Sequence, residues 1–321
     1  MKTILWIVVT FFTLISSVAS QTQGTYPAKP VRFVVAFGPG GIVDVAARLI
    51  APKLADAWGQ PVVVDNRAGA GGIVGTITVL RSVPDGYTVL VHGTAVAVAS
   101  RLNPNAGYDL ERDFIPVINF ASSPNMILAN PGLGAATLQQ AIDKARSGKL
   151  SYGSPGSGTP PHLSAEYLFK SLAKVNVTHV PYNAGPRAIA AGIGGEVQFV
   201  SITMASAMPH VRSGKLLALA VMSSQRTAAM PEVPTVADSG FPPFQDYTWV
   251  GLFLPKGSPQ EAVARLNADI EKLLATQDVR DRLVALGFDP VGGSPAQFAA
   301  YVKQESAKWA RVVKETGAKA D

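Results

Sequence analysis

Short apolar runs alternate with helical segments along most of the chain. The run Val31–Phe37 is rich in β-branched residues, which predicts a buried strand. Glycines and a proline at positions 38–41 end it, and a helical segment follows with Asp44 in its first turn. The same order of strand, glycine-rich turn and helix recurs from Val62 and again from Leu150. This alternation predicts an α/β protein with doubly wound, mainly parallel sheets flanked by helices.

The predicted elements form two groups. The first has strands at 31–37, 62–65 and 88–92 and a helix at 73–82; the second has helices at 137–147 and 160–172 and strands at 150–152, 177–180, 197–201 and 217–221. Extended segments at 115–120 and 126–129 lead into the second group, and the segment 248–254 leads back. Amphipathic helices at 260–276 and 295–316 follow, and we expect them to pack on the first lobe. The predicted lobes are 21–120 with 247–321, and 121–246, with hinges near Phe120 and Tyr247.

Glycine-rich turns follow three of the strands, at 38–41, 66–72 and 153–159. The first amides of a helix lack internal partners, and the helix N-terminus carries a partial positive charge. Glycine lets a ligand oxygen approach the backbone closely. Ligands of such sheets lie beyond the carboxyl ends of the strands. The turns therefore favour a site for a carboxylate or phosphate, although glycine turns with no ligand would have the same sequence.

The amino-acid composition excludes or disfavours several classes of function. The chain has 321 residues, of which 47% are hydrophobic, and a net charge of +6 without any run of five Lys or Arg. Such a thin basic excess disfavours nucleic-acid binding and suits attraction of small anions. Cysteine is absent, which excludes disulfides, thiolate metal sites and thiol nucleophiles.

The N-terminus has the pattern of a secretory signal peptide. Lys2 precedes an apolar run from Ile4 to Ile15, and small residues at 18–20 suit a cleavage site after Ser20. The run is short for a membrane span, and no cysteine is present to carry a lipid. We therefore expect residues 1–20 to be a signal peptide and the mature chain to be a free periplasmic protein.

Common catalytic and nucleotide-binding motifs are incomplete. Val43 and Val74 stand where the dinucleotide pattern needs glycine, and no serine has the flanking glycines of a nucleophile elbow. A Ser/His/Asp triad built from distant residues stays open. The four histidines, His92, His162, His179 and His210, lack metal-ligand spacing, so we expect no metal site. Asp44 suits capping of its helix better than general-base chemistry.

Several longer motifs occur together and in order. They include YPAKPVRFVVAFGPGGIVDVAARL, GQPVVVDNRAGAGG, PDGYTVL, KLSYGSPGSGTPPHLSAE, THVPYNAG, MPEVPTVADSG and WVGLFLPKGSP. Together with the helical C-terminus they cover nearly the whole mature chain. In these segments the sequence resembles the substrate-binding proteins of tripartite tricarboxylate transporters, the Bug-type receptors.

The resemblance implies a two-lobed, periplasmic-binding-protein-like fold of type II (a Venus flytrap). Its lobes would close on a small organic carboxylate and deliver it to a membrane permease, with no cofactor and no catalysis. We expect a monomer. The matching positions imply ligand contacts from the first loop, from the second loop, from the segment 201–203 and from the return segment: Phe37, Gly40, Gly41, Asp44, Ser154, Gly156, Gly158, Thr159, Thr203 and Trp249.

Departures from the family pattern bear on the ligand. Gly38 and Val43 replace the proline and threonine of many relatives, and Ser201-Ile202-Thr203 replaces an aromatic residue, an aspartate and an asparagine. Ile202 cannot pair with a ligand ammonium, so we expect a non-amino carboxylate with an apolar or aromatic body. Arg187 is either a contact to a second carboxylate or a solvated surface residue. A hydrolase or lyase acting on a small carboxylate, and a ligand-sensing subunit, are the alternative functions.

Overall fold

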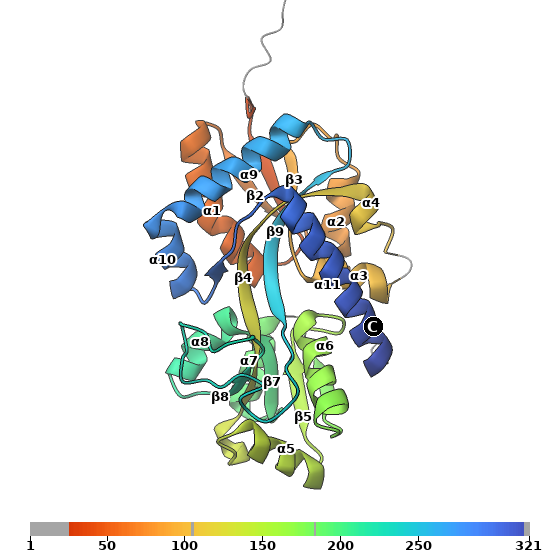
Figure 1. The fold of residues 1–321 in the computed structure, drawn as a ribbon, viewed down its shortest axis with the longest axis vertical. Coiled ribbons are helices and arrows are strands. Elements are labelled where there is room, and N and C mark those ends of the chain that lie inside the picture. The colour runs from red at the N-terminus through yellow and green to blue at the C-terminus, as the bar shows by residue number, and fades with distance from the viewer. Residues whose placement is uncertain (1–25, 104–105, 183, 318–321) are drawn as a thin grey trace, which may run out of the picture.

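The chain folds into two α/β lobes joined at a narrow waist (Figure 1). A computed structural model describes residues 26–103, 106–182 and 184–317. The predicted signal peptide, residues 1–20, lies outside these described ranges. None of the helices in the described ranges has the length and apolar character needed to cross a membrane.

Lobe 1 is built around three parallel strands. The strands β1 (Val31–Val35), β2 (Val62–Asn66) and β3 (Thr88–Gly93) lie in the order β2-β1-β3 and are followed by β9 and β4. The helices of this lobe are α1 (Ile42–Trp58), η1 (Ala70–Gly72), α2 (Ile73–Leu80), α3 (Ala95–Leu102), α4 (Leu110–Asp113), α9 (Gln260–Ala275) and α10 (Gln277–Ala285), and a short strand β10 (Asp289–Pro290) pairs with β4.

Lobe 2 repeats the arrangement. Its parallel strands are β5 (Ser151–Ser154), β6 (Thr178–Pro181) and β7 (Phe199–Thr203), and β8 (Leu217–Val221) pairs with β4 on the other side. Its helices are η2 (Pro131–Leu133), α5 (Leu138–Ser147), α6 (Pro160–Glu166), the π-helical η3 (Tyr167–Leu172), α7 (Gly185–Gly194) and α8 (Met204–Arg212). The two lobes thus confirm the predicted α/β class.

Two long strands connect the lobes. The strand β4 (Phe114–Ala129) pairs antiparallel with β9 (Tyr247–Pro255) in lobe 1 and with β7 in lobe 2. The sequence predicts two separate segments here, interrupted at Ser-Ser-Pro-Asn, but the strand is continuous. Pro124 lies where pairing with β9 ends and pairing with β7 begins, a position that tolerates a missing N–H.

Strand register fixes where the loops lie. Gly93, the last residue of β3, pairs with Val250 near the waist end of β9, and Thr203, the last residue of β7, pairs with Asn125 in the middle of β4. The strands β1 and β5 run parallel to β3 and β7, so they end at the same edges. The glycine turns of both lobes therefore lie at the waist.

The last helix packs on both lobes. The helix α11 (Pro295–Thr316) contributes Phe298 and Val302 to a core cluster of lobe 1, whereas Trp309 and Val312 belong to the core of lobe 2. The helix packs on lobe 1, as the sequence predicts, and its second half extends the contact to lobe 2. With 22 residues it is about 33 Å long, enough to pass the waist. Glu305 accepts the indole N–H groups of Trp309 and of Trp249 in β9.

We expect Trp309→Ala to lower the free energy of unfolding by about 3–5 kcal/mol, the usual cost of truncating a buried aromatic side chain. Trp309 is completely buried and would leave a cavity between α11 and lobe 2. Urea denaturation followed by circular dichroism measures the change. Lys303→Ala, at an exposed position of the same helix, is the control and should stay within about 0.5 kcal/mol of the wild type. Equal stability of Trp309→Ala and wild type would contradict this account of α11.

Candidate ligand site at the waist

The first glycine loop of lobe 1 is held by the Asp44 side chain. The Gly40 amide donates to Asp44 Oδ2 at 2.8 Å, and Asn66 Nδ2 donates to Oδ1 at 2.9 Å. Arg48, one turn along α1, donates from Nε at 2.9 Å. Gly40 has φ +78°, a conformation that a side chain would strain. Asp44 therefore fixes the shape of the loop.

Asp44 remains ionised in this arrangement. Burial alone would raise the pKa of its carboxyl, but hydrogen bonds from Arg48, the Gly40 amide and Asn66 outweigh this and lower the pKa. A carboxylate with these three partners organises the loop and has little reason to meet an anionic ligand. A direct contact from the Asp44 side chain to the ligand stays a prediction; in the structure this side chain does not cap α1 but holds the loop through the Gly40 amide and Asn66.

The amides that begin α1 are the clearest donors in lobe 1. Gly41 is the N-cap residue, and no side chain caps the helix. Among the residues that the structure describes, no hydrogen-bond acceptor is found for the amides of Ile42, Val43 and Asp44. These groups lie at the positive end of a 17-residue helix. They can accept a carboxylate oxygen.

Phe37 supplies an apolar surface beside these amides. Its half-buried ring meets the imidazole of His92 edge to face, with the ring centroids 5.1 Å apart. His92 is completely buried, and burial lowers its pKa to about 4. The imidazole is therefore neutral at physiological pH, and the Phe37 ring packs against it.

The second loop, in lobe 2, is tied by its own side chains. Ser154 Oγ lies 2.7 Å from His179 Nε2, and Thr159 Oγ1 donates to the Gly156 carbonyl at 2.7 Å. The Gly158 amide donates to His162 Nδ1 at 2.9 Å. The helix α6 that follows begins with two prolines, which carry no N–H. The donors of lobe 2 must therefore come from the loop backbone and hydroxyls.

Three aromatic rings stack beneath this loop. His162 and His179 lie 4.0 Å apart at 17°, and Tyr152 stacks on His179 at 4.8 Å. The Tyr152 hydroxyl donates to Glu166 Oε1 at 2.7 Å, and Lys170 pairs with the same carboxylate. The stack connects the loop to the buried side of α6.

The Ser154–His179 pair does not form a usable nucleophile. Ser154 is completely buried, so a substrate carbonyl cannot reach its hydroxyl. The proximity of serine and histidine instead holds the loop. This placement disfavours the hydrolase alternative that the sequence left open.

Two predicted contact residues outside the glycine loops are also buried. Trp249 has no exposed surface, and its indole packs against Phe253, Phe298 and Tyr301. In this structure it belongs to the core of lobe 1 and cannot touch a ligand. Thr203 is 4% exposed at the waist end of β7, with its hydroxyl 3.2 Å from Ser206 Oγ.

Sequence reasoning missed two residues that position the site. Asn66, at the end of β2, donates to the Phe37 carbonyl and to Asp44, and so joins the first and second glycine turns. Thr94, after β3, donates to the Tyr247 carbonyl and accepts the Trp249 amide, and so attaches lobe 1 to the returning strand. Each comes directly after a strand predicted from the sequence or close to its end, and this position was the only sign in the sequence that they help to form the site.

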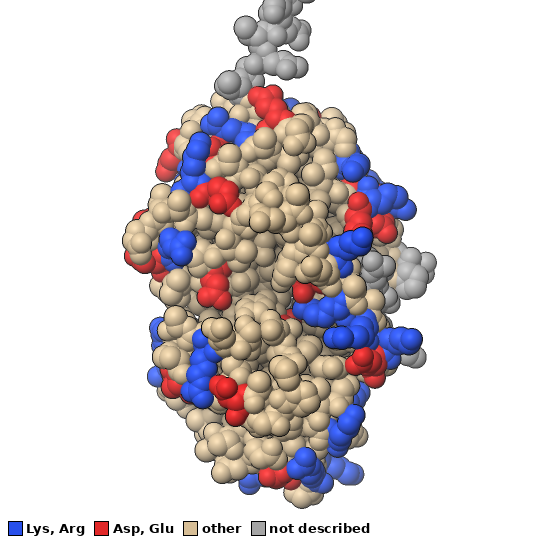
Figure 2. All heavy atoms as spheres, viewed as in Figure 1, with Lys and Arg blue, Asp and Glu red and all other residues tan. Residues whose placement is uncertain are grey.

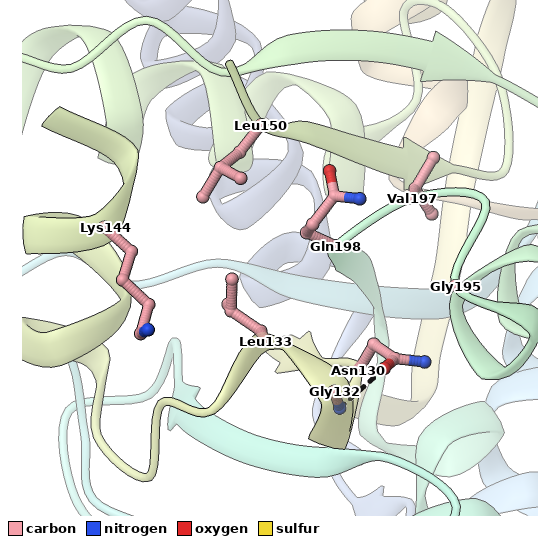
Figure 3. Close-up of a pocket in the computed structure, with 8 residues that line it drawn as sticks. All are labelled: Asn130, Gly132, Leu133, Lys144, Leu150, Gly195, Val197 and Gln198. Atoms are coloured by element: carbon pink, nitrogen blue, oxygen red, sulfur yellow. Dashed lines mark hydrogen bonds between the residues drawn. The ribbon is translucent and has the colours of Figure 1, made fainter. Parts of the chain in front are cut away.

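Two pockets of moderate size lie away from the two glycine loops. One, of about 440 Å³, opens at the far edge of the lobe 2 sheet, with Leu133, Leu150 and Lys144 on its walls (Figure 3). The other, of about 590 Å³, lies between β4 and α11 and is lined by Asn119, Tyr247, Tyr301, Glu305 and Lys308 among others. Neither contains any of the ten predicted contact residues.

Charge does not single out another site. On the face shown in Figure 2, the centre is largely uncharged, and Lys, Arg, Asp and Glu lie mixed around its margins. Arg187 is exposed in the first turn of α7. Within the described residues, no group of three or more His, Asp or Glu side chains is arranged to hold a metal ion.

Comparison with known proteins identifies relatives over nearly the whole chain. The family described as tripartite tricarboxylate transporter family receptor matches residues 46–318. Protein BugT of Bordetella pertussis is 37% identical over 305 residues, covering 94% of this chain and 93% of BugT.

Solved structures agree. Rpa4515 of R. palustris, solved with adipate, is 32% identical with a TM-score of 0.87, covering 92% of this chain and all of that one. MatC of Rhodopseudomonas palustris, solved with bound malate, is also 32% identical, with a TM-score of 0.82 and coverage of 90% of this chain and all of that one. The fold is that of periplasmic binding proteins, and the chain belongs to the tripartite tricarboxylate transporter receptor family.

Proposed function

We propose that this protein is a periplasmic receptor that captures a small organic carboxylate between its two lobes. The observation that carries the proposal is the convergence of amide-bearing turns from both lobes on the waist, which follows from the strand register. An anion placed there would be held by lobe 1 and lobe 2 together. Two similar proteins were solved with the dicarboxylates adipate and malate, which supports this class of ligand.

The proposed contacts come from both loops. In lobe 1, the amides of Ile42, Val43 and Asp44 bind one carboxylate beside the Phe37 ring, and Gly40 and Gly41 give it access to the backbone. In lobe 2, the partners are loop groups of Gly156, Gly158 and Thr159, with the buried Ser154 holding the loop in place and Thr203 at the edge. Each hydrogen bond to a charged group contributes about 1.5–3 kcal/mol, so one carboxylate held from each side is compatible with micromolar affinity, about −8 kcal/mol.

Closure is a hinge motion in the two crossing strands, near Phe120 and Tyr247. Only the closed form contacts the ligand with both lobes, so the ligand shifts the population toward it. We take 21–120 with 247–321 and 121–246 as the moving units, with the second half of α11 attached to the latter.

Delivery completes the proposed function. We propose that residues 1–20 direct export to the periplasm, and that the closed, liganded receptor docks on a tripartite permease. The family and the similar solved structures are binding proteins, and the buried Ser154 supports binding without catalysis. Turnover of a carboxylate by the purified protein would favour the hydrolase or lyase alternative, whereas saturable one-to-one binding without product favours the receptor.

We expect Ile42→Pro to weaken dicarboxylate binding by about tenfold to a hundredfold, because it removes one amide donor to a charged ligand. Proline is tolerated at the first position of a helix, and the preceding Gly41 is extended, with φ −74° and ψ 164°. Calorimetric titration with adipate and malate measures the change. Ile42→Ala, which also shortens the side chain but keeps the N–H, is the matched control. Equal losses in both variants would remove this amide from the site.

We expect the receptor to bind succinate at least about tenfold more tightly than aspartate, which differs from it only by an ammonium group. The Asp44 carboxylate is already taken by Arg48, Asn66 and the Gly40 amide, and Ile202 is an apolar residue, 2% exposed. The ammonium would therefore lose water without gaining a carboxylate partner. Competition titrations with succinate and aspartate, and with glutarate and glutamate, test this, and tighter binding of the amino acids would refute it.

A further inference from the structure

The hydrogen bond between Gly158 and His162 occupies one of the amides assigned to the ligand. The Gly158 N–H points at His162 Nδ1, at 2.9 Å, from a loop whose glycine has φ +74°. An imidazole nitrogen accepts such a bond only when it carries no proton. The proton of neutral His162 is therefore on Nε2, and the amide is engaged as long as the ring is neutral.

We propose that His162 is a positioning residue that withholds the Gly158 amide from the carboxylate when neutral and releases it to the carboxylate when protonated. The inference rests on the proposed function, because it concerns the same loop. A protonated Nδ1 has no lone pair for the amide, so the N–H turns to the nearest anion. The added positive charge also lies next to the loop. The released amide and the added charge both stabilise a bound carboxylate, so both make binding tighter.

The sign of the pH dependence follows. Protonated His162 favours the bound state, so the carboxylate binds more tightly as the pH falls through the titration of this imidazole. One additional hydrogen bond to a charged ligand corresponds to about tenfold in affinity. The expected change is therefore about a tenfold decrease in Kd on full protonation of this imidazole.

Other titratable groups surround the ring and must be distinguished from it. His179 of β6 and Tyr152 of β5 stack in sequence on His162, and Glu166 with its partner Lys170 lies one turn further along the helix. Asp246 accepts from Ser164 of the same helix. Because the two imidazole centroids are 4.0 Å apart, protonation of one ring disfavours protonation of the other.

The remaining histidines do not give the same signal. His179 Nε2 faces the Ser154 hydroxyl, which can donate or accept, so protonation of this nitrogen breaks no bond to an amide. In lobe 1, burial lowers the pKa of His92 to about 4, so it stays neutral across this range. His210 lies on α8, outside the stack.

The test compares the pH dependence of adipate and malate binding in wild type and three variants by calorimetry. His162→Asn places an oxygen near the Nδ1 position, so it keeps an acceptor for Gly158 but cannot be protonated. We expect its Kd to stay constant from pH 8 to 5.5, apart from the titration of the ligand itself, which all variants share. His179→Asn and the control His210→Asn should keep the roughly tenfold change.

The same switch is visible without ligand. In the ligand-free wild type, the ¹⁵N-resolved Gly158 amide proton should move upfield as His162 titrates, and it should not move in His162→Asn. A pH dependence that survives in His162→Asn, or that disappears only in His179→Asn, overturns the proposal while leaving the receptor function intact. Absence of binding of both dicarboxylates at every pH would overturn the proposed function, and the NMR titration would still decide whether His162 controls the amide.

Discussion

The pairing of β4 with β9 determines the rest of the architecture. These two strands cross the waist together, and every other strand takes its direction from one of them. Because β3 is antiparallel to β9 and β7 is antiparallel to β4, the carboxyl ends of the parallel strands in both lobes point to the waist. Two sheets that could each fold around their own core are thereby made to present their loops to a common space. The site is a consequence of strand direction before any side chain is considered.

The two halves of the site use different chemistry. Lobe 1 presents the start of a long helix, with three amides that have no partner among the described residues and an aspartate that shapes the loop without closing it. Lobe 2 begins its helix with two prolines, and its loop is held by a serine, a threonine and two histidines. In the proposed receptor, lobe 1 is thus preorganised for an anion, whereas lobe 2 must rearrange hydrogen bonds to receive it.

Sequence patterns predicted the elements well where periodicity and composition agreed. The helix 295–316 and the strand 217–221 have the predicted bounds, and the class and the family were both confirmed. Sequence patterns did not predict the features that depend on tertiary contacts. The apolar segment 95–102 and the glycine-rich segment 185–194 form helices that the sequence analysis did not identify, and the burial of Trp249 depends on α11, far away in the chain. Likewise, no local signal links Gly158 to His162 or Asn66 to Asp44.

The helix α11 restrains the two lobes on one side of the molecule. It is anchored by aromatic side chains at both ends, and Glu305 binds one indole from the returning strand and one from the helix itself. Because α11 packs on both lobes along one flank, the two lobes cannot separate equally on all sides. In the proposed hinge motion, the lobes therefore separate on the flank opposite α11, which would be the side where a solute enters and leaves.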